Sequence, residues 1–356
     1  MTVTGLASPR TAADDLPRAL EPVVQQMIPG ATHAQIRNWT AAERGFSTET
    51  YLFDLVGVGS GLGGAPNDTV GLVFRRPPEY QILPDYDLRR QYLTMQRLAG
   101  SAIPVPTVRW IDPTAGRLGT PYFVMDRIDG TVTVSDFPPY HQAGLFAEID
   151  DAGRARMWNG CVDMIAAVHR IDPAAHRLGF LGSRAPQSAP QALAGFLRYA
   201  ITWAYGDNTM HPTLRRALDW LDAHPYTPDR IALCWGDSRM SNVLYGHDLA
   251  PVAALDWEIA YLGDPAADVA WLLMTDWVSS PLPARRPAPG TPGRDETLER
   301  YARVTGHPLK NLRFSDLTAP LLLAVALIRL SGKLAMPDVD LADICAQRVE
   351  FILDGD

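Results

Sequence analysis

Three polar residues in the centre of the chain have types and spacing suited to phosphoryl transfer. Asp237 follows the apolar run 231–234, Asn242 lies five positions later, and Asp256 follows a second apolar run, 251–255. In enzymes that move a phosphoryl group from ATP, one carboxylate accepts the proton of an attacking hydroxyl, while an amide and a second carboxylate bind Mg²⁺. Only oxygen ligands suit that hard cation. The pattern predicts Asp237 as the catalytic base and Asn242 and Asp256 as the metal ligands.

The segment that carries these residues resembles the aminoglycoside phosphotransferase family, whose fold is similar to that of protein kinases. The family's catalytic loop usually reads His-Gly-Asp-x-x-x-x-Asn, and this chain departs from it at the first position, Trp235. Residues 255–258 and 263–268 match the second segment of the family, and this variant resembles in particular the kinase-like domains found beside or fused to acyl-CoA dehydrogenases. The resemblance implies an α+β, bilobal protein-kinase-like fold, with a small N-terminal lobe built on an antiparallel sheet and a larger, mostly helical C-terminal lobe.

The composition of the 356-residue chain restricts the classes of protein to which it can belong. A hydrophobic content of 47% with 20% charged residues is ordinary for a soluble globular protein. Because the net charge is −8, we expect neither a basic nucleic-acid-binding surface nor attraction to anionic membranes. The three cysteines lack metal-ligand spacing, which favours reduced core thiols in the cytoplasm; they are Cys161, Cys234 and Cys345.

Composition and the family resemblance together predict the domain organisation. Residues 1–13 are small and polar and are expected to form a loose tail, without the basic and apolar regions of a signal peptide. Residues 14–129 would form the N-terminal nucleotide-binding lobe and residues 130–356 the C-terminal lobe. The longest apolar run, 319–328, is shorter than the ~20 residues needed to cross a bilayer, so a buried helix is predicted there.

The first three strands predicted in the N-terminal lobe lie at 35–42, 51–58 and 69–76, and a further strand is predicted at 108–111. In the kinase-like fold the first hairpin turn, here residues 45–50, covers the ATP phosphates with backbone N–H groups and hydroxyls. Ser47 and Thr48 are therefore predicted phosphate contacts. A later G-x-G-x-x-G pattern at 59–64 is not followed by a helix and is interpreted as a hairpin loop.

The third strand ends where a kinase carries its ATP-binding lysine. Arg75 takes this position, and its guanidinium can bind phosphate oxygens in a bidentate manner. The helix predicted at 86–98 resembles the family's Arg-Glu-Tyr segment, but Gln91 stands in the place of the glutamate. The usual ion pair would then become a hydrogen bond between a neutral amide and a cation.

Residues 120–130 resemble the strand and linker that join the two lobes of the family. The resemblance implies that backbone amides near Asp126 and Ile128 meet the adenine edge, in an apolar slot that Met125 narrows.

From residue 131 the chain is predicted to be mostly helical, and two further interpretations concern its polar residues. His169 is interpreted as a structural histidine, and Arg239 as a brace of the catalytic loop rather than a γ-phosphate contact. The Pro-rich segment 279–293 is expected to be a mobile loop. The predicted helices are 157–169, 192–205, 212–223, 295–305, 316–334 and 341–353.

The predicted function is ATP- and Mg²⁺-dependent transfer of a phosphoryl group to the hydroxyl of a small molecule, with GTP left open as the donor. The acceptor is left between an aminoglycoside and a hydroxylated metabolite such as a hydroxyacyl thioester. The alternative is a degenerate kinase-like protein that binds nucleotide or acts as a scaffold, because Arg75, Gln91 and Trp235 depart from the family pattern. A protein kinase is disfavoured, since no activation segment follows Asp256. The oligomeric state is left open by the sequence.

Overall fold

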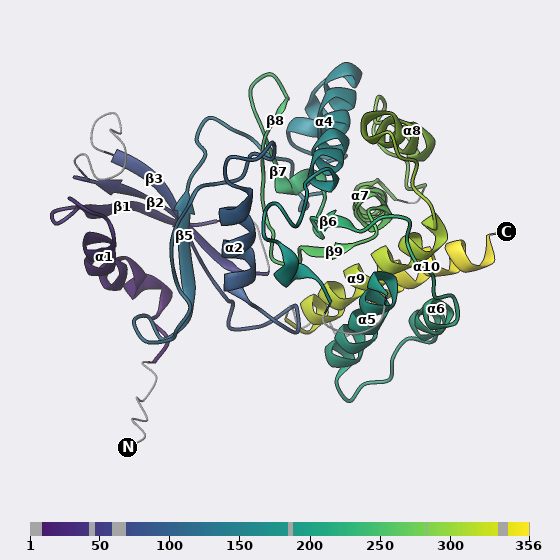
Figure 1. The fold of residues 1–356 in the computed structure, drawn as a ribbon, viewed down its shortest axis with the longest axis horizontal. Coiled ribbons are helices and arrows are strands. Elements are labelled where there is room, and N and C mark those ends of the chain that lie inside the picture. Colours follow the sequence, from purple (N-terminus) through teal and green to yellow (C-terminus); the bar gives the residue numbers. More distant parts are fainter. Residues whose placement is uncertain are drawn as a thin grey trace. The chain divides into compact units, whose positions relative to one another are not determined.

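The computed structural model describes residues 9–42, 47–58, 69–183, 188–282, 284–333 and 341–355. The fold is α+β and bilobal, as predicted (Figure 1). One compact unit comprises Met1–Gln81, Tyr86–Gln96 and Pro106–Asp129; the other comprises Ile82–Asp85, Arg97–Val105 and Gly130–Asp356. Two short segments that precede the predicted lobe boundary thus belong to the second unit.

The first unit is built on one antiparallel sheet with the strand order β1-β2-β3-β5-β4. Alternation places Tyr51, Phe53 and Leu55 on the buried face of the second strand. The strands are β1 (Gln35–Ala41), β2 (Glu49–Val56), β3 (Thr69–Arg76), β4 (Val108–Asp112) and β5 (Tyr122–Asp126).

Two helices cover the two faces of this sheet (Figure 1). The helix α1 (Leu16–Met27), preceded by the 3₁₀ turn η1 (Ala13–Asp15), buries its apolar stripe in the core that contains Tyr122 and Val124. The intervening residue of β5, Phe123, points to the other face and meets Tyr92 of α2 (Leu88–Leu98) edge-on, with ring centroids 6.2 Å apart. Because successive residues of β5 point to opposite faces of the sheet, this strand packs against both α1 and α2.

The segment just before α1 corrects the prediction of a loose tail at 1–13. Residues 1–8 lie outside the described residues, but Arg10 Nη2 donates to Glu49 Oε1 at 2.8 Å and to the carbonyl of Pro77 at 2.7 Å. Thr11 accepts from Arg76 Nη1 at 2.7 Å through its carbonyl and donates its N–H to Leu118 at 3.0 Å. Polar side chains of the sheet thus hold residues that look unstructured by composition.

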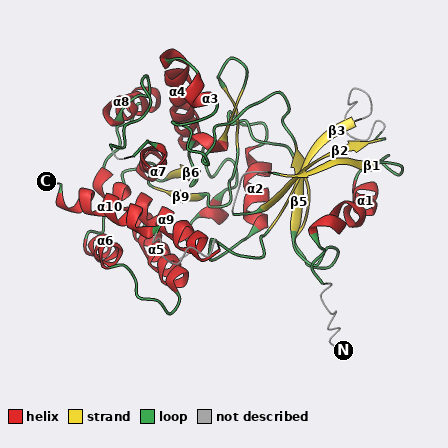
Figure 2. Ribbon diagram, turned by 180° about the vertical axis from the view of Figure 1, so that it is seen from behind, coloured by secondary structure: helices red, strands yellow, loops and turns green. Residues whose placement is uncertain are grey.

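The second unit consists mostly of helices (Figure 2). One of them, α9, is long and apolar enough to cross a membrane by length and composition, but 56% of its most apolar window is buried inside the protein. It packs against α5, α7 and α10, which fits the predicted buried core helix. The helices are α3 (Leu145–Glu148), α4 (Asp151–His169), α5 (Ala189–Tyr205), α6 (Pro212–Ala223), α7 (Ala266–Ser279), α8 (Arg294–Thr305), α9 (Leu312–Lys333) and α10 (Ala342–Asp354), with the 3₁₀ turns η4 (Gly179–Leu181) and η5 (Met240–Asn242).

Two small strand pairs lie among these helices. The strand β6 (Ala232–Cys234) pairs antiparallel with β9 (Tyr261–Gly263), and β7 (Val243–Tyr245) pairs antiparallel with β8 (Pro251–Ala254). The sequence predicted β6 and β8 but not their partners. Each pair holds one end of the segment that carries the predicted transfer residues.

The Pro-rich segment 279–293 is more tightly held than its composition predicts. Arg154 Nε donates to the carbonyl of Pro289 at 2.6 Å, and the N–H of Ala288 donates to His141 Nδ1 at 3.1 Å. Gly290 has φ +81°, and a Cβ there would lie 2.4 Å from Asp151 Cα. The prediction of a mobile loop overlooked these contacts, which come from α4 and from residue 141.

Candidate active site

The catalytic loop begins at the end of β6 and is held by one buried carboxylate of α7. Asp268, 1% exposed, accepts the N–H of Trp235 through Oδ2 at 2.7 Å and the N–H of Gly236 through Oδ1 at 2.9 Å. The carbonyl of Asp268 accepts the hydroxyl of Ser238 at 2.8 Å. These bonds hold the backbone before Asp237 and the side chain of the residue after it.

Gly236 is required by the close approach of a second loop. Its φ is +86°, and a Cβ at this position would lie 2.4 Å from the carbonyl oxygen of Ile259. A side chain would meet both a strained backbone conformation and a backbone atom.

Asp237 is 8% exposed, and both of its carboxylate oxygens are engaged. Oδ1 accepts the indole N–H of Trp271 at 2.8 Å and lies 2.9 Å from Arg239 Nε, whereas Oδ2 accepts Nδ2 of Asn242 at 2.7 Å. Burial raises the pKa of Asp237 above its ordinary value, and Asp256 adds to the rise against the opposing effect of Arg239. A carboxyl with this environment is suited to accept a proton.

The β7–β8 hairpin brings the two predicted metal ligands together. Val243 pairs with Ala254, and the N–H of Leu255 donates to the carbonyl of Asn242 at 2.8 Å, so Asn242 lies beside the residue that precedes Asp256. Asp256 itself has φ +60°, a left-handed conformation that aspartate tolerates better than most residues.

The donor set of this hairpin fits Mg²⁺. The amide nitrogen of Asn242 donates to the carbonyl of Asp237 at 2.9 Å as well as to its Oδ2. Because both partners are acceptors, they bind the amide nitrogen of Asn242, and its amide oxygen lies on the other side of the amide group. A neutral oxygen and the carboxylate of Asp256 are the hard donors that Mg²⁺ prefers.

Trp235, which departs from the family pattern, links the two loops. Its indole N–H donates to the carbonyl of Leu255 at 2.7 Å, and its ring stacks on Trp257 with centroids 5.5 Å apart. The indole therefore joins the catalytic loop to the residues on either side of Asp256. Although tryptophan replaces the histidine of the family motif, the first position still carries a ring N–H donor.

Arg239 has the bracing contacts that the sequence interpretation favoured. Its Nη1 lies 2.6 Å from Oδ2 of Asp136, and its Nε faces Asp237. Burial alone would lower the pKa of Arg239, but Asp237 and Asp136 together hold it above its usual range. The guanidinium is a permanent cation between two carboxylates.

His169 is confirmed as a structural histidine. Its Nε2 lies 2.9 Å from Asp268 Oδ2 and its Nδ1 lies 2.7 Å from the hydroxyl of Tyr301, which also receives a hydrogen bond from Arg230 at 3.3 Å. His169, Cys234 and Asp268 have metal-ligand chemistry and lie close together. However, both oxygens of Asp268 already accept N–H groups, and burial raises the pKa of the Cys234 thiol well above its ordinary value. This cluster is a hydrogen-bonded support of the catalytic loop.

In the first unit, the structure brings together two of the predicted phosphate-binding residues. Arg75 is 7% exposed, and its Nε and Nη2 both donate to Oγ1 of Thr48, the former at 3.0 Å. Gln91 is buried in α2, and Ser47 is half-buried at the end of the phosphate turn. Residues 43–46 of this turn and the glycine pattern at 59–64 lie outside the described residues.

The predicted adenine-binding linker needs a correction in its hydrogen bonds. The N–H of Asp126 donates to the carbonyl of Thr107 at 2.8 Å, so this amide is engaged in the sheet. The carboxylate of Asp126 receives Nε and Nη2 of Arg109 at 2.5 and 2.7 Å. Met125 is buried in β5, and Ile128 follows the strand.

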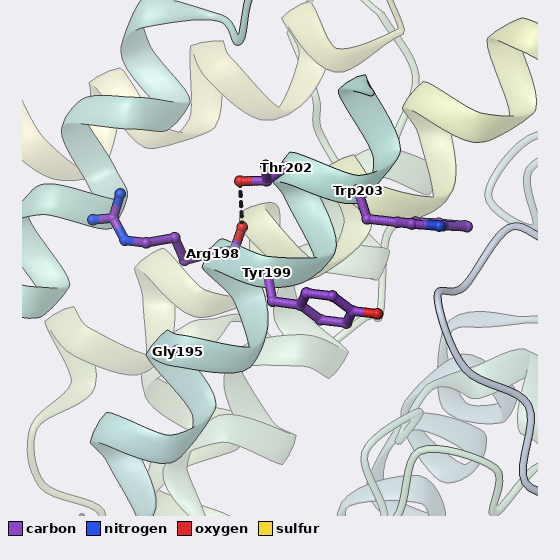
Figure 3. Close-up of a pocket in the computed structure, with 5 residues that line it drawn as sticks. All are labelled: Gly195, Arg198, Tyr199, Thr202 and Trp203. Carbon is purple, nitrogen blue, oxygen red and sulfur yellow. Dashed lines mark hydrogen bonds between the residues drawn. The ribbon is translucent and has the colours of Figure 1, made fainter. Parts of the chain in front are cut away.

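A pocket of about 470 Å³ lies on α5 (Figure 3). None of its lining residues belongs to the predicted site, and the guanidinium of Arg329 lies 4.7 Å from the ring of one of them, Trp203. The lining residues are Gly195, Arg198, Tyr199, Thr202 and Trp203.

Among the predicted transfer residues, the structure therefore groups Asp237, Asn242 and Asp256 in the second unit. Sequence reasoning missed Trp271, although a signal existed. Trp271 lies three positions after Asp268, and on a helix such as α7 residues so spaced share a face.

Solved structures that resemble this chain include phosphotransferases and a protein of the choline/ethanolamine kinase family. A protein from Ralstonia eutropha JMP134 that is assigned as an aminoglycoside phosphotransferase has a TM-score of 0.69 at 21% identity, covering 95% of this chain and 98% of its own. A mutant of aminoglycoside phosphotransferase APH(4)-Ia in a ternary complex with ADP and hygromycin B has a TM-score of 0.58 at 14% identity, covering 94% and 98%. At these identities the likeness shows the fold.

Curated relatives carry the same type of domain within longer chains. Acyl-CoA dehydrogenase family member 10 of Mus musculus is 27% identical over 217 residues, which are 60% of this chain and 19% of the relative. Acyl-CoA dehydrogenase family member 11 of Gallus gallus is 27% identical over 203 residues, 56% of this chain and 24% of the relative. The chain thus spans about a fifth to a quarter of these relatives.

The sequence profile described as the phosphotransferase enzyme family, APH, matches residues 38–302, which is more than half of the chain. Its match includes the catalytic loop, the β7–β8 hairpin and Asp268. The chain belongs to the APH phosphotransferase family.

Proposed function

We propose that this protein transfers the γ-phosphoryl group of ATP to a hydroxyl of a small molecule, with Mg²⁺ as the metal. The observation that carries the proposal is the buried carboxylate of Asp237, bonded at 2.7 Å to the side chain of Asn242. A structural neighbour in complex with ADP and another with AMP-PNP, both also holding hygromycin B, support the choice of nucleotide and of a small-molecule acceptor.

Each residue has a distinct role in this proposal. Asp237 accepts the proton of the acceptor hydroxyl as its oxygen approaches the γ-phosphorus. Asn242 and Asp256 would hold Mg²⁺, which supplies neutralisation of the phosphate charge when bound. Arg75 and Thr48 would hold the phosphates, so that catalysis depends on positioning and charge rather than on a covalent intermediate.

The acceptor is proposed to be a hydroxylated metabolite, of which a hydroxyacyl thioester is the first to test. The relatives that share this type of domain are named as acyl-CoA dehydrogenase family members. Transfer to the hydroxyl of an aminoglycoside such as hygromycin B is the competing acceptor class.

Calorimetry of ATP binding tests the nucleotide part of the proposal. Binding to the wild type should require Mg²⁺ and should weaken strongly in Asp256→Ala, because that change removes a charged metal ligand. Asp207→Ala, a change at an exposed aspartate, serves as the matched control. An affinity for ATP that changes neither on removal of Mg²⁺ nor in Asp256→Ala would refute the metal assignment.

A transfer assay tests the chemistry. Radiolabelled ATP is offered with a 3-hydroxyacyl thioester or hygromycin B, and labelled acceptor is measured for the wild type and Asp237→Ala. The proposal expects transfer to the thioester that is lost by several orders of magnitude in Asp237→Ala with ATP binding retained. Equal transfer by both proteins would reject Asp237 as the base.

A further inference from the structure

One of the side chains that bind the Asp237 carboxylate comes from α7. Trp271 is 7% exposed, and its indole N–H donates to Oδ1 of Asp237 at 2.8 Å. One helical turn earlier, Asp268 binds the backbone N–H groups of Trp235 and Gly236. A single face of α7 thus holds both the backbone and the side chain of the catalytic loop.

The contacts of Asp237 distinguish its two oxygens. A carboxylate oxygen has two lone-pair directions. On Oδ1, one direction is taken by Trp271 and Arg239 Nε lies 2.9 Å away. On Oδ2, the side-chain bond comes from Asn242 at 2.7 Å. Oδ2 is therefore the oxygen with room to receive a further hydrogen bond.

We propose that Trp271 is a positioning residue for phosphoryl transfer, because its indole N–H fixes the Asp237 carboxylate so that Oδ2 receives the proton of the acceptor hydroxyl. The inference rests on the proposed function. Oδ2 of Asp237 is then the oxygen that acts as the base, and Trp271, which lies outside the family motif, selects it.

The acceptor oxygen forms a bond to the γ-phosphorus while the bond from that phosphorus to the β–γ bridging oxygen breaks, and ADP leaves with the bond electrons. The proton of the acceptor hydroxyl passes to Oδ2 of Asp237. Without the indole donor only Asn242 and Arg239 hold the carboxylate, and a rotation about its Cβ–Cγ bond then moves Oδ2 from its place opposite the acceptor.

The chain offers a matched control for the loss of an indole hydrogen bond. Trp158 in α4 is fully buried, and its N–H donates to Oγ1 of Thr297 at 2.9 Å, with no part in the site. Trp158→Phe and Trp271→Phe each keep an aromatic ring and remove one buried donor. They differ in whether the acceptor is Asp237.

The first measurement is steady-state ATP hydrolysis with Mg²⁺ and water as the acceptor. Trp271→Phe should lower kcat by roughly ten- to a hundredfold, the size expected for one lost charged hydrogen bond at a reacting group, and should change KM for ATP by less than about twofold. Trp158→Phe should keep the kcat of the wild type, while its melting temperature falls as much as that of Trp271→Phe. Equal kcat values for the two variants, or a loss carried by KM, would overturn the inference.

The second measurement reads the hydrogen bond directly and needs no activity. In protein labelled with ¹⁵N-tryptophan, the indole resonance missing from Trp271→Phe is that of Trp271. This resonance should move in Asp237→Asn, and the resonance of Trp158 should not. If the chemical shift of the Trp271 indole is the same in Asp237→Asn as in the wild type, the inference is overturned, whether or not ATP is hydrolysed. A wild type that neither binds nor hydrolyses ATP, with the Trp271 resonance still sensitive to residue 237, overturns the proposed function instead.

Discussion

Replacing Asp268 by asparagine tests the support of the catalytic loop. Oδ2 of Asp268 accepts two N–H groups, from Trp235 and His169, and Oδ1 accepts that of Gly236. In Asp268→Asn the amide oxygen can still accept the N–H groups of Trp235 and His169, but the amide nitrogen then faces the N–H of Gly236. One buried backbone donor loses its acceptor, and the two remaining bonds lose the strength that a charged acceptor gives them.

The magnitude follows from these contacts. An unsatisfied buried donor costs about 1–3 kcal/mol, and weakening two charged hydrogen bonds adds about 1 kcal/mol, so the free energy of unfolding should fall by roughly 2–4 kcal/mol. For a unit of this size, 1 kcal/mol shifts the melting temperature by about 2–4 °C, which predicts a decrease of roughly 5–15 °C.

Scanning calorimetry measures this shift, and hydrogen exchange at the amide of Gly236 locates it. Exchange of that amide should become faster in Asp268→Asn, and kcat should fall with it. Asp207→Asn, the same chemical change at an exposed position, should change stability by less than about 0.5 kcal/mol. A melting temperature within about 1 °C of the wild type, with the Gly236 amide still protected, would refute the role given to Asp268.

Three further changes test other contacts. Gly236→Ala should lower both the melting temperature and kcat, because its Cβ would meet the carbonyl of Ile259 at 2.4 Å; wild-type values for both would contradict the close approach. Removal of residues 1–12 should destabilise the first unit, since it deletes the bonds of Arg10 to Glu49 and of Thr11 to Arg76; urea unfolding followed by the fluorescence of that unit measures the loss. Burial raises the pKa of Tyr122 to about 12 from 10.0, so the stability that its neutral form contributes below pH 10 should be lost between pH 10 and 12, by on the order of 2–3 kcal/mol. Tyr122→Phe should flatten that alkaline decline, and an unchanged slope would show that Tyr122 does not titrate in this range.

Much of the fold could be predicted because its elements carry local patterns. The alternation of Tyr51, Phe53 and Leu55 identified β2, and apolar spacing predicted α6 at its observed bounds, Pro212–Ala223. β7 and β9 have three residues each, which is too short for a period to be recognised; β6 is equally short but was predicted from the apolar run 231–234 that precedes Asp237.

The predicted transfer residues could be proposed from the sequence because their order along the chain is itself the motif. The contacts that support them join distant parts of the sequence and leave no local trace. His169 and Asp268 are 99 positions apart, and Arg239 and Asp136 are 103 apart. Similarly, the contacts that hold 284–293 come from residues 141 and 154, so composition alone predicted a loose segment.

The position of Asp237 favours a working enzyme over a degenerate one. A buried carboxylate costs stability unless it is paired, and burial raises the pKa of Asp237 despite the nearby Arg239. A protein that served only as a scaffold would gain stability by replacing this group with an apolar residue. The chain instead surrounds it with donors from Trp271 and Asn242, and keeps a ring donor at Trp235 where the family pattern has changed. Groups that are costly for folding and well supported by their neighbours are typical of sites retained for chemistry.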